Sequence, residues 1–541
     1  MTLGNVQLAL ILMLLTTWIA AKADTFETGD RLGVINFATS CNEPAQQEFN
    51  RSVALLHSFQ FSRAIGGFNS VLRSDPTCGI AYWGMALSDW SNPFATGLKD
   101  FTQLESGRRD AARGKTLGAK TERERSYIAA VSALYADFEN TSQRLRLLAY
   151  RNAMRDLAAK ESQDREAQIF YALSLAASED PSDKTYASRL EAGAILEKLF
   201  RTEPNHPGLA HYIIHTYDVP ALAPRAMSAA RRYSAIAPDA PHALHMPSHT
   251  FTRTGFWQES IDANIAATDA ARREGQTAEE LHGDDYEVYA LLQTGQDGAA
   301  RRIVDSLPEI ASRFDPKAIV NGAAGPAAAF FALAAIPARY ALERSDWQRA
   351  SQLPVLETPY PYTDAMTWFA RGMGAARLDQ VPLAVESANA LRRIHERLVD
   401  TDENYWAEQV EIQEVSISAW ATLARGKREE ALRLMKAAAK LEDRTEKSAI
   451  TPGPLAPARE LLGEMLLQVN APSQALEQFE LTLKKEPGRF RAVYGAARAA
   501  QLSGKHDVSQ KHYRSLLQIS AHGDNPGRVE ILEARQATSH P

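Results

Sequence analysis

Apolar residues recur at helical spacing along most of the chain, whereas the alternating runs typical of β-strands are scarce. The recurring unit is a pair of helices joined by a short turn. In residues 45–76, Val53–Leu56 supplies the apolar face of the first helix, Phe68 lies on the second, and Asp75-Pro76 ends the pair. This pattern predicts an all-α protein built from consecutive helical hairpins.

Three segments interrupt the helical pattern, at about 92–120, 312–325 and 354–364. The first is basic, and we expect it to be a flexible loop. The third is rich in proline and tyrosine. Loops inserted between helical repeats often lie on one face and contribute to binding, although a simple surface excursion explains them equally well.

Two stretches 34 residues apart share the pattern Pro-x-x-Pro-x-x-x-His-x-x-x-His. The first runs from Pro204 to His215 and the second from Pro238 to His249. A spacing of 34 residues is the period of the tetratricopeptide repeat (TPR). The chain resembles the TPR superfamily over most of residues 45–520, and it is similar to secreted bacterial TPR proteins that carry paired His-x-x-x-His segments.

The resemblance implies a right-handed superhelical TPR solenoid over residues 24–520, with degenerate repeats in the centre. It places histidine-bearing repeats at about 204–310, the most regular repeats at about 454–520, and a C-terminal tail at 521–541. A TPR array is a scaffold for many functions, so this fold by itself assigns none.

In TPR proteins, certain positions of each first helix line the concave groove. Carried onto this sequence, these positions predict a metal site made of His211, His215, His245, His249, His282 and Asp285. The same positions place His242 and Tyr289 in the groove as binding residues.

The spacing of the histidines supports a shared site. Side chains four residues apart lie on one helix face, about 5–6 Å apart at Cβ, and neighbouring helices pack about 8–10 Å apart. We therefore expect His211 and His215 to face His245 and His249. Imidazole with a carboxylate suits a divalent transition metal, Zn or Cu above others.

Pro247 falls inside the second His-x-x-x-His segment, so the helix there is expected to be kinked or to begin late. Two interpretations without a metal remain open for these histidines. They could line a polar binding groove, or they could be packing residues retained from a duplicated repeat.

Other polar residues are candidates for the groove or its edge. Arg253 would bind an anionic substrate or pair with a nearby acid, and His57 is expected to be a packed core residue. Glu460 and Glu464 point into the groove in the same register, although a solvated acidic face is the simpler interpretation. The remaining histidines are expected to be exposed: His206, His395, His506, His512, His522 and His540.

The N-terminus resembles a secretion signal. The apolar run from Leu8 to Ala21 is followed by Ala21-Lys-Ala23, which predicts a signal peptide at 1–23 and cleavage before Asp24. No Lys or Arg precedes the run, so an uncleaved anchor is the alternative, although about 14 residues are fewer than the roughly 20 that span a bilayer. We expect a periplasmic or secreted protein with no stable membrane span.

The chain has two cysteines, Cys41 and Cys78. In an oxidising compartment, an isolated pair is most simply a disulfide. The alternative, metal ligation, is weakened because neither cysteine has a second Cys or a His nearby in the sequence.

The 541 residues carry a formal net charge of −6, and their basic residues are scattered, so no nucleic-acid partner is expected. No phosphate loop or nucleophile motif occurs. Three functions remain: a metal-dependent enzyme with a small-molecule substrate in the groove, a metal-free scaffold for a peptide or protein partner, and a metal-handling protein.

Overall fold

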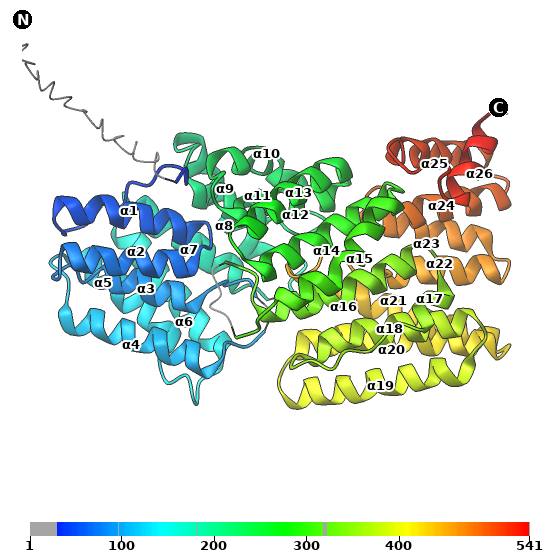
Figure 1. The fold of residues 1–541 in the computed structure, drawn as a ribbon, viewed down its shortest axis with the longest axis horizontal. Helices are drawn as coiled ribbons and strands as arrows, with labels where there is room; N and C mark the ends of the chain where they lie inside the picture. Colours follow the sequence, from blue (N-terminus) through cyan, green and yellow to red (C-terminus); the bar gives the residue numbers. More distant parts are fainter. Residues whose placement is uncertain (1–29, 96, 181, 318–321, 540–541) are drawn as a thin grey trace, which may run out of the picture.

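The computed structural model describes residues 30–95, 97–180, 182–317 and 322–539. Within these ranges the chain is an all-α solenoid of helical hairpins with no β-strand, as the hydrophobic pattern predicts (Figure 1). The predicted signal peptide at 1–23 lies outside the described residues. No helix of the described ranges is both long and apolar enough to span a membrane.

The helices follow one another closely. The first half contains α1 (Glu43–His57), α2 (Phe61–Ser74), α3 (Ala81–Trp90), α4 (Phe101–Leu117), α5 (Glu122–Ser132), η1 (Ala133–Tyr135), α6 (Gln143–Lys160), α7 (Arg165–Ala177), α8 (Ala187–Thr202), α9 (Pro207–Thr216), η2 (Ala223–Ala226), α10 (Met227–Ile236), α11 (Pro241–His245), α12 (Pro247–Thr254), α13 (Trp257–Arg273) and α14 (Thr277–Gln293). The second half contains α15 (Asp297–Arg313), α16 (Pro326–Glu343), α17 (Trp347–Ser351), α18 (Pro361–Arg377), α19 (Val381–Asp400), α20 (Asn404–Ala424), α21 (Arg428–Arg444), α22 (Ala458–Gln468), α23 (Pro472–Lys485), α24 (Phe490–Leu502), α25 (His506–Ile519) and α26 (Val529–Ser539).

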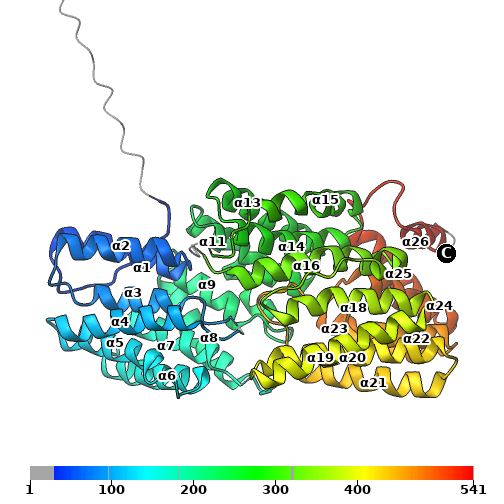
Figure 2. The same cartoon turned by 60° about the horizontal axis from the view of Figure 1, so that its bottom comes forward.

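Each helix packs on the next in sequence, and alternate helices pack side by side. Helices α14, α16, α18 and α20 form one such row, with α13 and α19 packed against members of the row (Figure 2). Helix α26 lies in the predicted C-terminal tail and packs on α25. The result is the layered arrangement expected of stacked helical repeats.

The segment at 92–120 differs from the expected flexible loop, because residues 101–117 form α4. Asp100 caps this helix by accepting a hydrogen bond from the backbone N–H of Gln103, and Leu104 and Ala111 are buried against the N-terminal core. The basic residues of this segment lie on the solvent side of an amphipathic helix. The prediction of a flexible loop, which relied on these charges, was therefore wrong.

The superhelix curls so that its second half contacts the repeats that carry the histidines. The indole N–H of Trp257 donates to the carbonyl of Gly488, and the backbone N–H of Phe490 donates to the side chain of Gln293. Gly255 ends α12 at a φ of 76°, and a Cβ there would meet the carbonyl oxygen of Pro487 at 2.6 Å. The turn at Gly255 therefore has to remain glycine for the two halves to meet.

A buried ion network lies at this junction and corrects the expectation of a solvated acidic face. The guanidinium of Arg489 donates to Glu460 at 2.7 and 3.0 Å and lies 2.6 Å from Glu343, in an ion pair. All three side chains are fully buried. Glu464 is bound by Arg491 and Arg377. The carboxylates can be buried because each has an arginine partner from outside its own helix.

The structure contains the expected disulfide between Cys41 and Cys78, with Cα atoms 5.1 Å apart. It joins the residue before the Asn42 cap of α1 to the turn between α2 and α3, which closes a loop across a sequence separation of 37. The bond therefore restrains the first hairpin of the solenoid.

We expect a Cys41→Ser/Cys78→Ser variant to lose about 2–4 kcal/mol in free energy of unfolding, because the open chain regains the entropy of this loop. Urea denaturation of the oxidised protein and of the variant measures the difference. Wild-type protein under reducing conditions should match the variant. Equal midpoints for the oxidised and reduced forms would contradict a structural disulfide.

Candidate metal centre

Four helices bring six histidines together, with His249 on α12 and His282 on α14. His211 and His215 lie on α9, while His242 and His245 lie on α11. The expected kink in the second segment is present, because α11 ends at His245 and Pro247 opens α12. A proline has no N–H to donate and fits best in the first turn of a helix, so it divides this helix in two.

The six imidazoles form two groups of three. The His211 triad comprises His211, His215 and His242, and the His245 triad comprises His245, His249 and His282. Within each triad, one ligand atom per residue lies within 4.8 Å of the others, and all six side chains are buried. We expected His211 and His215 to face His245 and His249. Instead, His242 completes the group with His211 and His215.

Hydrogen bonds on the far side of the rings decide which nitrogen of His245 and His249 carries the proton. His245 Nδ1 lies 2.7 Å from Asn264 Oδ1, and the Asn264 amide nitrogen donates to the carbonyl of Ser260, which fixes the amide orientation. His249 Nδ1 lies 3.0 Å from a carboxylate oxygen of Asp218. Both acceptors require a proton on Nδ1, so both Nε2 atoms present lone pairs.

These two lone pairs face one another. His245 Nε2 and His249 Nε2 are 3.1 Å apart. Two neutral acceptors at this distance repel each other unless a cation lies between them. Two nitrogen ligands of a tetrahedral ion, each about 2.0–2.1 Å from it, would be about 3.3 Å apart. The geometry of the His245 triad therefore fits a metal ion.

A shared proton is the alternative cation, and the local electrostatics oppose it. Burial, followed by the neighbouring histidines, holds the pKa of His245 well below its ordinary value, and burial lowers the pKa of His249 to about 3. Burial likewise lowers the pKa of His282. The rings are therefore neutral at pH 7, which is the state that binds metals.

Asp218 holds His249 in place and is itself held by two cations. Its carboxylate accepts hydrogen bonds from Arg253 Nε and Lys447 Nζ, both at 3.0 Å. Burial opposes ionisation, but these two charges keep the pKa of Asp218 well below its usual value. Of the two expectations for Arg253, pairing with a nearby acid is the one observed.

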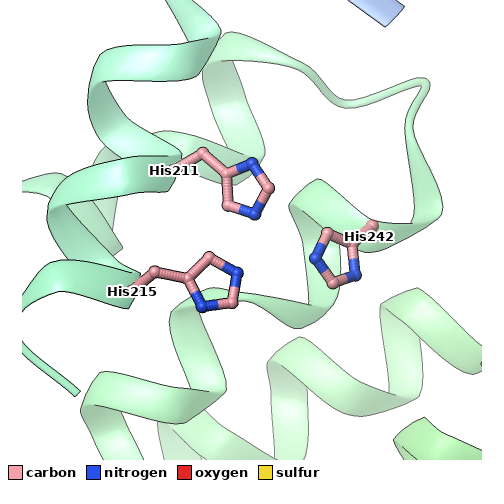
Figure 3. Close-up of side chains that lie close together, drawn as sticks. All are labelled: His211, His215 and His242. Atoms are coloured by element: carbon pink, nitrogen blue, oxygen red, sulfur yellow. The ribbon is translucent and has the colours of Figure 1, made fainter. Parts of the chain in front are cut away.

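The His211 triad has a similar arrangement (Figure 3). His211 Nδ1 donates to the backbone carbonyl of His57 at 2.6 Å, so its Nε2 presents a lone pair. His215 and His242 direct their rings toward His211, with ring centroids 4.9 and 5.1 Å from it. Phe94 stacks on His215 at 4.2 Å and shields the group from water.

A third group of potential ligands, His57, Glu166 and His206, is a hydrogen-bond network. Leu209 N–H donates to His206 Nδ1, so His206 Nε2 donates to Glu166 at 3.0 Å. His57 Nε2 donates to the other carboxylate oxygen at 2.9 Å. Each ring nitrogen of His57 and His206 has a hydrogen-bond partner, so this group is satisfied without a metal.

The remaining histidines differ in how far they are buried. His206 is buried, so the expectation of exposure was wrong, whereas the expectation that His57 is a core residue is confirmed. His506 and His522 are exposed as expected. His395 and His512 are half-buried, and His540 lies outside the described residues.

Two residues expected beside the histidines have other partners. Asp285 forms a fully buried ion pair with Arg339 at 3.1 Å, and its carboxylate is absent from the ligand groups of the described residues. Tyr289 donates to Glu486 at 2.8 Å and accepts from Arg489. Both residues lie farther along α14, where arginines from the second half of the chain bind them.

A cleft enclosing about 1020 Å³, including its open mouth, lies beyond the Asp218 contacts. Arg253 and Lys447 belong both to its wall and to the contacts of Asp218. Its lining is mostly apolar, with Phe331, Phe369 and Trp406 among it. Seven charged residues also line it: Arg253, Glu442, Glu446, Lys447, Arg459, Lys485 and Glu486. A mixed lining of this kind suits a small polar molecule or a peptide side chain.

The sequence alone does not point to Asp218, Asn264 or Lys447 as site residues. Asp218 follows α9 by two residues, and a carboxylate near a His-x-x-x-His pair is a usable local signal. Lys447 gives no such signal, because 229 residues separate it from Asp218.

Comparisons with known proteins assign this chain neither a family nor a function. No protein-family profile matches the chain, and no curated protein matches it. Among solved structures, the human IFIT1 dimer with m7Gppp-AAAA aligns at 9% identity and a TM-score of 0.37, covering 89% of this chain and 96% of that one. The human IFIT1 dimer with PPP-AAAA aligns at 9% identity and a TM-score of 0.35, with the same coverage. Likeness at this level assigns the chain neither a family nor a ligand, and the all-α solenoid rests on the helix packing described above.

Proposed function

We propose that this protein is an exported, metal-dependent enzyme whose His245 triad holds one divalent transition ion, Zn or Cu. The observation that carries the proposal is the pair of lone pairs on His245 Nε2 and His249 Nε2, which face each other at 3.1 Å. The Asn264 and Asp218 contacts on the opposite ring nitrogens are the usual supports of metal-binding histidines.

Two features support catalysis over a purely structural ion. Three protein ligands leave a fourth position open, whereas structural zinc sites have four. Arg253 and Lys447 line the cleft and also bind Asp218, which in turn binds His249. A molecule bound in the cleft would therefore lie near the metal ion. A metal ion with an open position supplies Lewis acidity or an activated water. Arg253 and Lys447 would orient an anionic or polar group of the substrate.

Export rests on the N-terminal sequence and accords with the disulfide. Protein recovered from periplasm should begin at Asp24, which intact-mass measurement checks. A mass that retains residues 1–23 would contradict cleavage.

The decisive test is elemental analysis of periplasmic protein without an affinity tag, beside a His245→Ala/His249→Ala variant. We expect at least one equivalent of metal in the wild type and loss of one equivalent in the variant. The matched control is His506→Ala/His522→Ala, which removes two exposed histidines and should retain the full content. Circular dichroism checks that each variant is folded.

Wild-type protein with less than a tenth of an equivalent, after incubation with Zn²⁺ or Cu²⁺ and desalting, would overturn the proposal. The histidines would then be groove or packing residues. The cleft would become the main candidate for a peptide or protein partner, to be tested by pull-down.

A further inference from the structure

We infer that the protein holds a second divalent transition ion at the His211 triad, making a two-ion centre of six histidines. This inference rests on the proposed function, since it adds an ion beside the one assigned to the His245 triad. The ligand set contains no carboxylate, which favours Zn or Cu over Mg, Ca or Mn.

The first observation is a set of buried nitrogen atoms without partners. His211 Nε2, His215 Nε2 and both ring nitrogens of His242 find no hydrogen-bond partner among the described residues. Leaving buried polar atoms unpaired is unfavourable, and one nitrogen from each of the three rings lies within 4.8 Å of the others (Figure 3). The His57–Glu166–His206 network, by contrast, leaves no nitrogen unpaired. The His211 triad therefore has nitrogen atoms that still need a partner, whereas the His57–Glu166–His206 network has none.

The second observation is that two of the three rings, those of His211 and His242, have an oxygen acceptor behind them. The carbonyl of His57 fixes the His211 tautomer, with Nε2 toward the cluster. Glu279 Oε2 lies 3.8 Å from His242 Nδ1 and is itself held by the backbone N–H of Ala324. A carboxylate behind a histidine is a recurrent support for metal ligands, so Glu279 would leave His242 Nε2 for the ion.

The surroundings also favour an ion over water. Phe94 stacks on His215, and Phe59 packs at 4.3 Å against His211 and at 5.6 Å against His242. A water molecule in such a site needs two to four polar partners, and His211 Nε2, with its tautomer fixed, offers only a lone pair. A cation satisfies several lone pairs at once, because each imidazole binds it as a ligand.

The two triads are neighbours. The rings of His215 and His249 are 5.8 Å apart at their centroids, and those of His242 and His245 are 6.0 Å apart. Two ions with three protein ligands each would present open positions within one cluster. Such a pair suits a small bridging ligand such as hydroxide, dioxygen or phosphate.

Metal stoichiometry tests the inference. Folded wild-type protein loaded with Cu²⁺ and desalted should hold two ions per chain. The His211→Ala/His215→Ala and His245→Ala/His249→Ala variants should hold one each, and His506→Ala/His522→Ala should hold two. Electron paramagnetic resonance of the Cu²⁺-loaded wild type gives a readout that needs no variant. Neighbouring ions should give a broadened or weakened signal, and each folded triad variant should give an isolated-ion signal.

The outcomes separate the two proposals. One ion that is kept without His211 and His215 but lost without His245 and His249 overturns the second site and leaves the proposed function. One ion lost in both variants means a single ion shared by the cluster, which also overturns the two-ion centre. No bound ion overturns both proposals. An isolated-ion signal from the wild type overturns the inference even where the variants fail to fold.

Discussion

Replacing Asp218 with Asn should weaken metal binding by about 10- to 100-fold, the effect typical of losing a carboxylate behind a metal-binding histidine. The ionised carboxylate keeps the proton of His249 on Nδ1. An amide can present its NH₂ group instead, which favours the tautomer with the proton on Nε2 and removes the ligand lone pair. Competition with a chelator of known affinity measures the change in Kd.

The same substitution should reduce the free energy of unfolding by about 3–5 kcal/mol, because Arg253 and Lys447 would be left as buried cations without their carboxylate. Adding Lys447→Met should recover part of the stability but not the metal affinity. Asp305→Asn is the matched control, since Asp305 lies on the surface of α15 and should affect neither property. Unchanged Kd in a folded Asp218→Asn protein would show that Asp218 does not orient a metal ligand.

Replacing Arg489 with Met should lower the free energy of unfolding by about 3–5 kcal/mol, the cost of removing one partner from a buried ion network. Glu343 and Glu460 would remain buried, with Arg491 at 3.6 Å as the other cation near Glu460. The phenol of Tyr289 would also lose its donor. Urea denaturation followed by circular dichroism measures the loss.

The comparison variants separate charge from packing. Changing Glu343, Glu460 and Arg489 together to Met should cost less than Arg489→Met alone, because no unpaired charge stays buried. Arg301→Met removes an exposed i,i+4 pair with Asp305 and should leave the midpoint nearly unchanged. If Arg489→Met behaves like Arg301→Met, the network does not hold the two halves of the solenoid together.

The sequence predicts those features that depend on neighbouring residues. The 3.6-residue period predicts helices, and the 34-residue spacing predicts stacked hairpins. The same logic holds for His211 with His215, since side chains four residues apart on one helix meet whatever surrounds them. His245 and His249 also meet, at 3.1 Å, although the break at Pro247 lies between them. Pro247 breaks its helix as expected, for an equally local reason.

Errors arose where a side chain's surroundings come from a distant helix. Glu460 is predicted to be a solvated acid, but Arg489 binds it in the interior, and His206 is predicted to be exposed, but Glu166 binds it. The register of the repeats placed Asp285 beside the histidines, but Arg339 of α16 binds it instead. Burial of a polar group depends on its partner, and the sequence does not show that partner.

The sequence by itself therefore determined a helical-repeat protein with phased histidine pairs, because helix periodicity and i,i+4 proximity are local properties of the chain. Only the tertiary structure decided that His242 joins His211 and His215, and that His282 joins His245 and His249. It also decided that Lys447 reaches Asp218 across 229 residues. The curl of the superhelix brings these groups together, and that curl is the sum of many small packing angles between successive helices.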